Sequence, residues 1–127
     1  MELEILFSPS PLPPASSPGV VSGVGAFARF EGIIRGEEDG ASISGIRYEA
    51  YEEMAKKEMQ RIARDIASRH DLVAARVIHR VGWVAVGETA IRIDVTSRHR
   101  NAAFAFLSEF MDQLKTDVPI WKAEIQA

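Results

Sequence analysis

Two stretches with helical spacing of apolar residues constrain the fold of this chain most. In residues 52–70 and 98–115, apolar side chains recur every three or four positions, which places them on one face of a helix. They are Ala55, Met59, Ile62, Ala63 and Ile66 in the first stretch and Ala103, Phe106, Leu107, Phe110 and Leu114 in the second. Each helix must bury this stripe against another layer, and 127 residues suffice for one such core. We therefore expect a single domain over residues 1–127.

Strand-length runs surround these helices. Runs rich in apolar, β-branched and aromatic residues occupy 1–7, 24–34, 43–50, 74–81 and 89–96, with a short one at 120–124 after Pro119. An acidic turn at 36–40 separates the second and third runs, so we expect these two to pair as a hairpin.

Two further segments lie between the expected elements. Residues 82–87 carry Trp83 and valines between glycines, and we expect them to form a connection. Residues 8–22 contain Pro11, Pro13, Pro14 and Pro18 among serines, and therefore predict a loop. The pattern as a whole predicts an α+β fold with two main helices on a mostly antiparallel sheet.

Bulk composition excludes several classes of function. The sequence has no cysteine, so the chain has no disulfide, thiolate metal site or thiol of its own, and any sulfur it handles must arrive on another molecule. A net charge of −3 argues against nucleic-acid binding. Apolar runs stay far below the ~20 residues of a membrane span, and no signal peptide is recognisable, which favours a soluble, cytoplasmic protein. The three dispersed histidines and the absence of a nucleotide-binding fingerprint predict neither a metal site nor a cofactor.

The start of the second helix is electrostatically unusual. Arg98, His99 and Arg100 stand at the end whose dipole and free N–H groups repel cations. A bound anion resolves this conflict, because a helix N-terminus with guanidinium groups forms a phosphate site. Arginines that point into solvent or pair with acidic neighbours explain the pattern equally well.

Three more basic residues are candidates for a site. Lys122 lies beside Trp121 in an apolar segment, where a desolvated lysine can act as an acid, a base or a nucleophile. Lys115 falls in the last helical turn, where dipole complementation is the commoner explanation. Arg35 ends a strand beside the acidic turn, a usual place for a binding residue, although a solvated arginine is the simpler alternative. His79 is expected to pack within the sheet.

Four segments of the chain together resemble one known family. They are residues 25–35, 78–82, 95–104 (Val-Thr-Ser-Arg-His-Arg-Asn-Ala-Ala-Phe) and 114–124 (Leu-Lys-Thr-Asp-Val-Pro-Ile-Trp-Lys-Ala-Glu). The last two are the specific ones, and the resemblance covers roughly residues 24–124. On these motifs the chain resembles the molybdopterin synthase catalytic (large) subunit family, MoaE-like.

The resemblance implies a fold, an activity and partners. The fold is an α/β hammerhead, and the assembly is a homodimer within a heterotetramer that carries a ubiquitin-like small subunit at each far end. The activity is a sulfurtransferase reaction without a cofactor, in molybdenum cofactor biosynthesis. The small subunit inserts a thiocarboxylated Gly-Gly tail, and two sulfur transfers to cyclic pyranopterin monophosphate build the dithiolene of molybdopterin, with opening of the cyclic phosphate.

The resemblance also implies residue roles. Lys115 serves the chemistry beside the thiocarboxylate, as acid, base or transient acyl acceptor, and Lys122 serves substrate charge and proton transfer. Glu124 matches an acidic residue that orients a lysine. Arg35, His99 and Arg100 are the basic substrate contacts, and His99 and Arg100 are donated across the dimer interface. Ile33, Ile34 and Ala123 contribute wall or backbone contacts.

Two departures from the family pattern leave other functions open. Ile33-Ile34 replaces a basic residue that often precedes the arginine, and family members usually continue well beyond the Trp-Lys-x-Glu run, whereas this chain stops at Ala127. A non-catalytic relative that acts as a binding or scaffold subunit is therefore one alternative. An unrelated α+β dimer that binds a small phosphorylated ligand is another.

Overall fold

The computed structural model describes residues 1–17, 19 and 22–127. In chain order, these residues form β1 (Glu2–Ser8), β2 (Ala26–Ile33), β3 (Glu37–Glu38), β4 (Ala41–Ser42), β5 (Gly45–Ala50), α1 (Glu52–Ala67), β6 (Leu72–Arg80), β7 (Gly82–Ala85), β8 (Thr89–Ser97), α2 (Arg100–Asp117) and β9 (Ile120–Gln126). The predicted α+β class is confirmed. Of the helices that the structure describes, none is long and apolar enough to cross a membrane.

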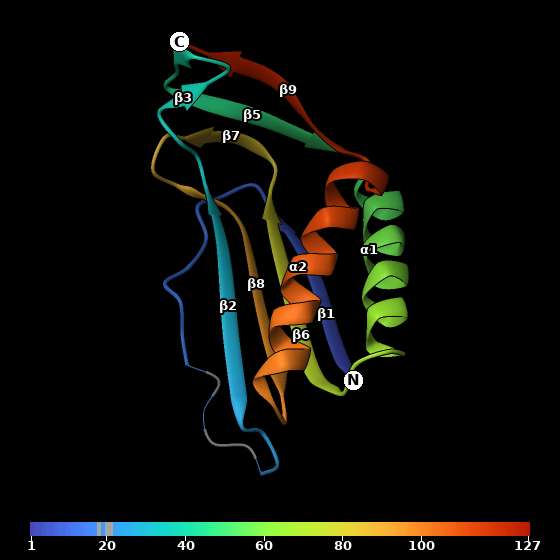
Figure 1. Cartoon of the computed structure of the whole chain (residues 1–127). Helices are drawn as coiled ribbons and strands as arrows, with labels where there is room; N and C mark the ends of the chain where they lie inside the picture. The colour runs from blue at the N-terminus through green and yellow to red at the C-terminus, as the bar shows by residue number, and fades with distance from the viewer. Residues whose placement is uncertain (18, 20–21) are drawn as a thin grey trace.

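The larger sheet and the helices form the main layers. Its strand order is β1-β6-β8-β2, with β1 parallel to β6 and the other neighbours antiparallel. Both α1 and α2 lie across one face of this sheet (Figure 1). The core between the layers includes the fully buried Met59, Val77, Ile93, Phe106 and Phe110. Burial of each such side chain favours folding by about 1.5–3 kcal/mol, which explains why the helical stripes face the sheet.

A smaller sheet, ordered β7-β5-β9, stands at one end of the larger one (Figure 1). The chain passes from the larger sheet to the smaller one between β6 and β7, where Gly82 has a φ of +81° that favours glycine. On the neighbouring strand β5, Gly45 approaches Trp83 so closely that a Cβ would collide with the indole ring. Ile46 and Val84 are buried beneath this contact. The two glycines thus permit the bend and the close packing that join the sheets.

The expected hairpin between residues 24–34 and 43–50 is wrong. β2 pairs with β8, whereas β5 pairs with β7 on one side and β9 on the other. The acidic turn between them closes on itself, because Glu37 and Glu38 pair with Ser42 and Ala41 as the small β3–β4 ladder. Because the two runs are neighbours in the sequence, we expected them to pair, but in the structure β2 and β5 belong to different sheets.

The expected connection at 82–87 is also wrong in part, since residues 82–85 form β7. A strand this short, interrupted by glycine, has a weak local signal and is held by its partner β5. The helices agree with the sequence except at their ends, where α1 stops three residues earlier than expected and α2 is displaced by two residues.

Two arginines anchor the Pro-rich segment that follows β1. Arg29 donates to the carbonyl oxygen of Ser16 at 2.5 Å, and Arg92 donates to that of Pro13 at 2.7 Å. Beyond Ser8, the described part of the predicted 8–22 loop contains neither strand nor helix. Residues 18, 20 and 21 of that prediction lie outside the described residues.

Candidate functional site

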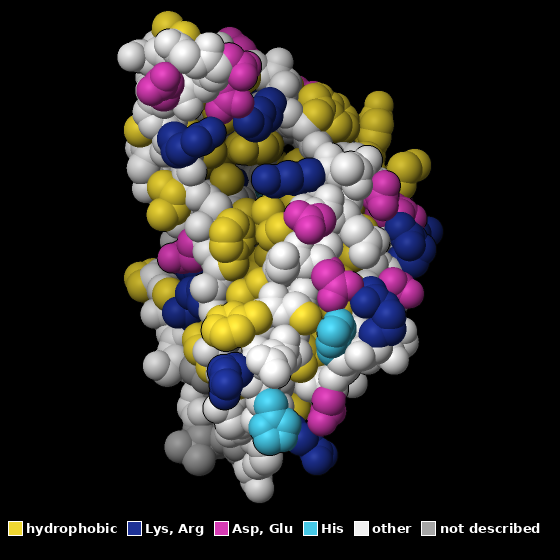
Figure 2. Space-filling model, viewed as in Figure 1, with side chains coloured by type: hydrophobic (Ala, Val, Ile, Leu, Met, Phe, Trp, Pro, Cys, Tyr) yellow, Lys and Arg dark blue, Asp and Glu magenta, His cyan; other side chains and the backbone are white. Residues whose placement is uncertain are grey.

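A pocket of about 360 Å³ lies where the end of α2 meets both sheets. On the face shown in Figure 2, basic side chains gather beside apolar ones over the upper ends of β2 and α2. The lining comes from β2, β5, β6, β8, α2 and β9, and consists of Phe30, Gly32, Ile33, Ile34, Tyr48, His79, Ala90, Ile91, Met111, Leu114, Lys115, Ile120, Trp121 and Lys122. The pocket therefore brings together four residues predicted from the sequence: Ile33, Ile34, Lys115 and Lys122.

A chain reversal places the two lysines in the same pocket. Lys115 occupies the last turn of α2, which ends before Val118 and Pro119. Pro119 cannot continue the helix, and the chain turns back as β9, antiparallel to β5, with Lys122 opposite Tyr48. Lys115 is exposed and the Lys122 side chain is 42% exposed, so both ammonium groups lie at the mouth of a mainly apolar pocket.

Glu38 is the carboxylate that contacts Lys122, and sequence reasoning did not single it out. The Lys122 ammonium donates to Glu38 Oε1 at 2.8 Å, from a position 84 residues away in the chain. This hydrogen bond and the charge of Lys122 lower the pKa of Glu38, and the nearby charge of Arg35 lowers it further. Glu38 is therefore ionised at neutral pH. The acidic turn at 36–40 was visible in the sequence, but its contact with Lys122 was not.

A buried ring, that of His79, and a partly buried one, that of Tyr48, line the pocket. His79 is 4% exposed and lies edge-on to Tyr48, with ring centroids 5.2 Å apart. The imidazole Nδ1 lies 2.6 Å from the carbonyl oxygen of Arg80, and because a carbonyl only accepts, Nδ1 carries the hydrogen. Burial lowers the pKa of His79 and raises the pKa of Tyr48, so both side chains are neutral at pH 7. The prediction that His79 packs within the sheet is confirmed.

Arg35, Ala123 and Glu124 lie outside this lining. Arg35 follows β2, is exposed, and borders a separate depression beside the acidic turn. Ala123 is exposed on β9. The Glu124 carboxylate lies 3.4 Å from Arg47 Nε and accepts a hydrogen bond from Gln126 at 2.6 Å. Glu124, the carboxylate expected to orient a lysine, thus contacts Arg47. The carboxylate that contacts Lys122 is that of Glu38.

His99 and Arg100 lie at the opposite end of α2 from Lys115. A helix rises about 1.5 Å per residue, so the fifteen-residue separation of Arg100 and Lys115 corresponds to roughly 22 Å. In the described structure, the first turn of α2 has no acidic residue and His99 makes no capping hydrogen bond through its side chain. The electrostatic conflict predicted from the sequence is therefore present. Arg98, by contrast, lies 3.6 Å from the exposed carboxylate of Asp71, as the simpler alternative expects.

Comparison with known proteins identifies the family. Residues 13–117 match the family model described as MoaE protein. The chain is 39% identical, over 104 residues, to the molybdopterin synthase catalytic subunit of Pyrococcus abyssi, an alignment that covers 82% of this chain and 70% of that protein. The chain belongs to the MoaE family of molybdopterin synthase catalytic subunits.

Solved structures agree with this assignment. The molybdopterin synthase structure from Staphylococcus aureus has a TM-score of 0.77 and 25% identity, and the match covers 97% of this chain and 93% of that one. A chain in a Helicobacter pylori complex of subunits 1 and 2 of molybdopterin-converting factor has a TM-score of 0.66 and 27% identity, with 79% and 65% covered. The predicted family and activity, a sulfurtransferase of molybdenum cofactor biosynthesis, are confirmed. An unrelated ligand-binding dimer is excluded.

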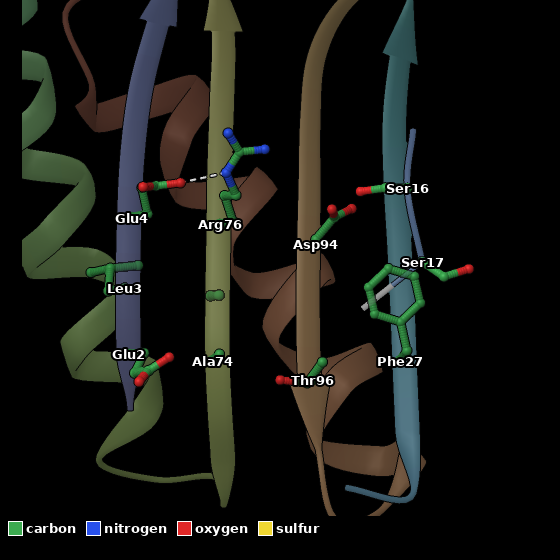
Figure 3. Close-up of a pocket in the computed structure, with 11 residues that line it drawn as sticks. Glu2, Leu3, Glu4, Ser16, Ser17, Phe27, Ala74, Arg76, Asp94 and Thr96 are labelled. Carbon is green, nitrogen blue, oxygen red and sulfur yellow. Dashed lines mark hydrogen bonds and ion pairs between the residues drawn. The ribbon is translucent and has the colours of Figure 1, made fainter. Parts of the chain in front are cut away.

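A larger depression, of about 610 Å³, lies on the face of the larger sheet that the helices leave uncovered (Figure 3). Three of its charged side chains, those of Glu4, Arg76 and Asp94, are paired with neighbours. Glu4 pairs with Arg76, and Asp94 accepts from Arg29 at 2.7 Å. None of the site residues predicted from the sequence lines this depression, whereas four of them line the pocket at the end of α2.

Proposed function

We propose that this chain transfers sulfur from the thiocarboxylated C-terminus of a ubiquitin-like small subunit to cyclic pyranopterin monophosphate. The observation that carries the proposal is the placement of Lys115 and Lys122 in one pocket with mainly apolar walls. The chain has no cysteine, so the sulfur must come from the partner. The Helicobacter pylori relative, solved as a complex of subunits 1 and 2, supports a partner of this kind.

The pocket suits the chemistry of a thiocarboxylate. Its apolar walls, among them Ile33 and Leu114, exclude water that would otherwise hydrolyse the activated tail. We assign Lys115 to the reacting carbonyl, where it acts as acid, base or transient acyl acceptor. Lys122 binds the charge of the substrate and moves protons. The neutral His79 and Tyr48 form the floor and leave these two ammonium groups as the charged groups of the lining.

The reaction requires a second copy of the chain to complete the site. His99 and Arg100 lie roughly 22 Å along α2 from Lys115, too far to act with it in one chain. Figure 2 shows a strip of apolar side chains that runs down this face below the upper basic side chains, and Phe104 on α2 is 61% exposed. We infer that this apolar strip is the contact between the two copies. A partner copy packed on the strip in the opposite direction places its His99 and Arg100 beside the lysine pocket. There the start of its α2 and the guanidinium of Arg100 bind the substrate anion.

Single-turnover conversion of cyclic pyranopterin monophosphate, with a thiocarboxylated small subunit, tests the proposal. The wild type should form the dithiolene product, and Lys115→Ala should abolish product formation. Its melting temperature should change little, because a lysine in the last helical turn contributes only about 0.3–1 kcal/mol through the dipole.

Lys57→Ala is the matched control, because Lys57 is also an exposed helical lysine but lies on α1. This variant should turn over like the wild type. Normal turnover in Lys115→Ala, or a large loss of its thermal stability without loss of activity, would remove Lys115 from the mechanism. Tight binding of the small subunit without any product from the wild type would contradict the proposed reaction.

A further inference from the structure

The small β3–β4 ladder holds Glu38 in a defined position beside Lys122. Glu38 pairs with Ala41 across the ladder, and the backbone N–H of Ile43 donates to the carbonyl oxygen of Gly36 at 3.1 Å. Asp39 and Gly40 close the turn with φ values of +50° and +81°. The Glu38 side chain is 20% exposed, less than the 42% of its partner Lys122. This carboxylate is therefore held against Lys122 by its own backbone.

The surroundings of Glu38 are those of a bound anion. The Lys122 ammonium donates to its carboxylate at 2.8 Å, and the charge of Arg35 acts on the same group. The proposed function assigns Lys122 to the charge of the substrate, and the family resemblance implies that Arg35 contacts the substrate. An internal carboxylate thus occupies the place beside Lys122, the residue to which the proposed function assigns the charge of the substrate.

We propose that Glu38 is a specificity-determining residue whose carboxylate occupies the anion position beside Lys122 until the phosphate of the substrate displaces it. This inference rests on the proposed function and extends it to a residue outside the family motifs quoted above. A phosphate group replaces one anion by another, so Lys122 stays paired when the site fills. A neutral ligand brings no anion to replace Glu38. It therefore either leaves the Glu38–Lys122 ion pair intact, or separates the pair and leaves both side chains without an oppositely charged partner. The pair thereby favours phosphorylated ligands over their dephosphorylated forms.

Glu38→Gln tests this through the affinity for inorganic phosphate, measured by chemical-shift titration at pH 7. The amide keeps the size of the side chain but not its charge, so phosphate no longer competes with an internal anion. Exposed and half-exposed ion pairs contribute about 0.2–1 kcal/mol, and the dissociation constant should therefore fall by about 1.5- to fivefold.

Two matched variants separate competition from a general change in charge. Glu37→Gln removes the same charge from the adjacent residue of β3, which is exposed, and should leave phosphate affinity close to the wild type. In a Lys122→Met background, Glu38→Gln should no longer tighten binding, because the residue for which the two anions compete is gone. Unchanged affinity in Glu38→Gln, or equal tightening in Glu37→Gln, would overturn the proposal.

Turnover supplies a second readout. With cyclic pyranopterin monophosphate and a thiocarboxylated small subunit, Glu38→Gln should lower KM and raise kcat/KM, whereas a purely structural role would lower kcat/KM and the melting temperature together. An unchanged or raised KM also contradicts the proposal. If the wild type forms no product, the proposed function fails, and the phosphate titration still decides the role of Glu38.

Discussion

His79 shows how burial sets the charge of a single residue at the back of the pocket. Its pKa is lowered from 6.5 because burial penalises the imidazolium form. Below about pH 6.5 the unfolded chain takes up a proton that the folded chain excludes. The free energy of unfolding contributed by His79 is therefore complete above that pH and falls as the pH drops below it.

Replacement of His79 should remove this pH dependence. We expect His79→Gln to be less stable than the wild type at pH 7.5, because the ring and its contact with Tyr48 are lost. As the pH falls from 7.5 to 5, the difference in melting temperature should narrow, since the variant no longer carries the buried titrating group. Thermal unfolding of both proteins across this range checks the prediction. Parallel pH curves would show that His79 titrates alike in the folded and unfolded chains.

The proposed function places site residues at both ends of α2 and a subunit contact along its exposed side. Phe104, 61% exposed on α2, is part of that contact in the proposed homodimer. Phe104→Glu places a charge there and should give a monomer, as measured by sedimentation. Turnover should fall with it, because the partner's copy of the His-Arg pair no longer reaches the lysine pocket.

Met54→Glu is the control for this change. Met54 is 58% exposed on α1, so it introduces the same charge at a similarly exposed apolar position on the other helix. This variant should remain dimeric. A dimeric Phe104→Glu protein with normal turnover would place the subunit contact elsewhere.

The proposed homodimer predicts complementation between two inactive variants. Lys115→Ala and Arg100→Ala are each expected to lose most activity as homodimers. In a heterodimer of the two, purified through separate affinity tags, one site combines an intact Lys115 with an intact Arg100 from the other copy. That site should restore about half of the wild-type turnover, because a twofold dimer has two equivalent sites. A heterodimer as inactive as its parents would show that both residues act within one chain.

Local chemistry explains what could be predicted about the fold. Helical periodicity located α1 and α2, and strand-length runs located most of the larger sheet, because side-chain burial repeats with the period of each element. The partner of β5 was not predictable in the same way. Its neighbours β7 and β9 lie far along the chain, and the acidic turn that suggested a hairpin closes on itself as β3 and β4.

In the site, too, local sequence determines some features and the tertiary structure determines others. The sequence by itself determined the family motifs, the absence of a thiol, and the unusual charge at the start of α2, because each depends on residues adjacent in the chain. Only the tertiary structure decided that Lys122 meets Glu38 and that His79 lines the same pocket as Lys115. These relations depend on how Pro119 reverses the chain and on which sheet edges meet. Such contacts join residues distant in sequence, and packing of the whole molecule sets them.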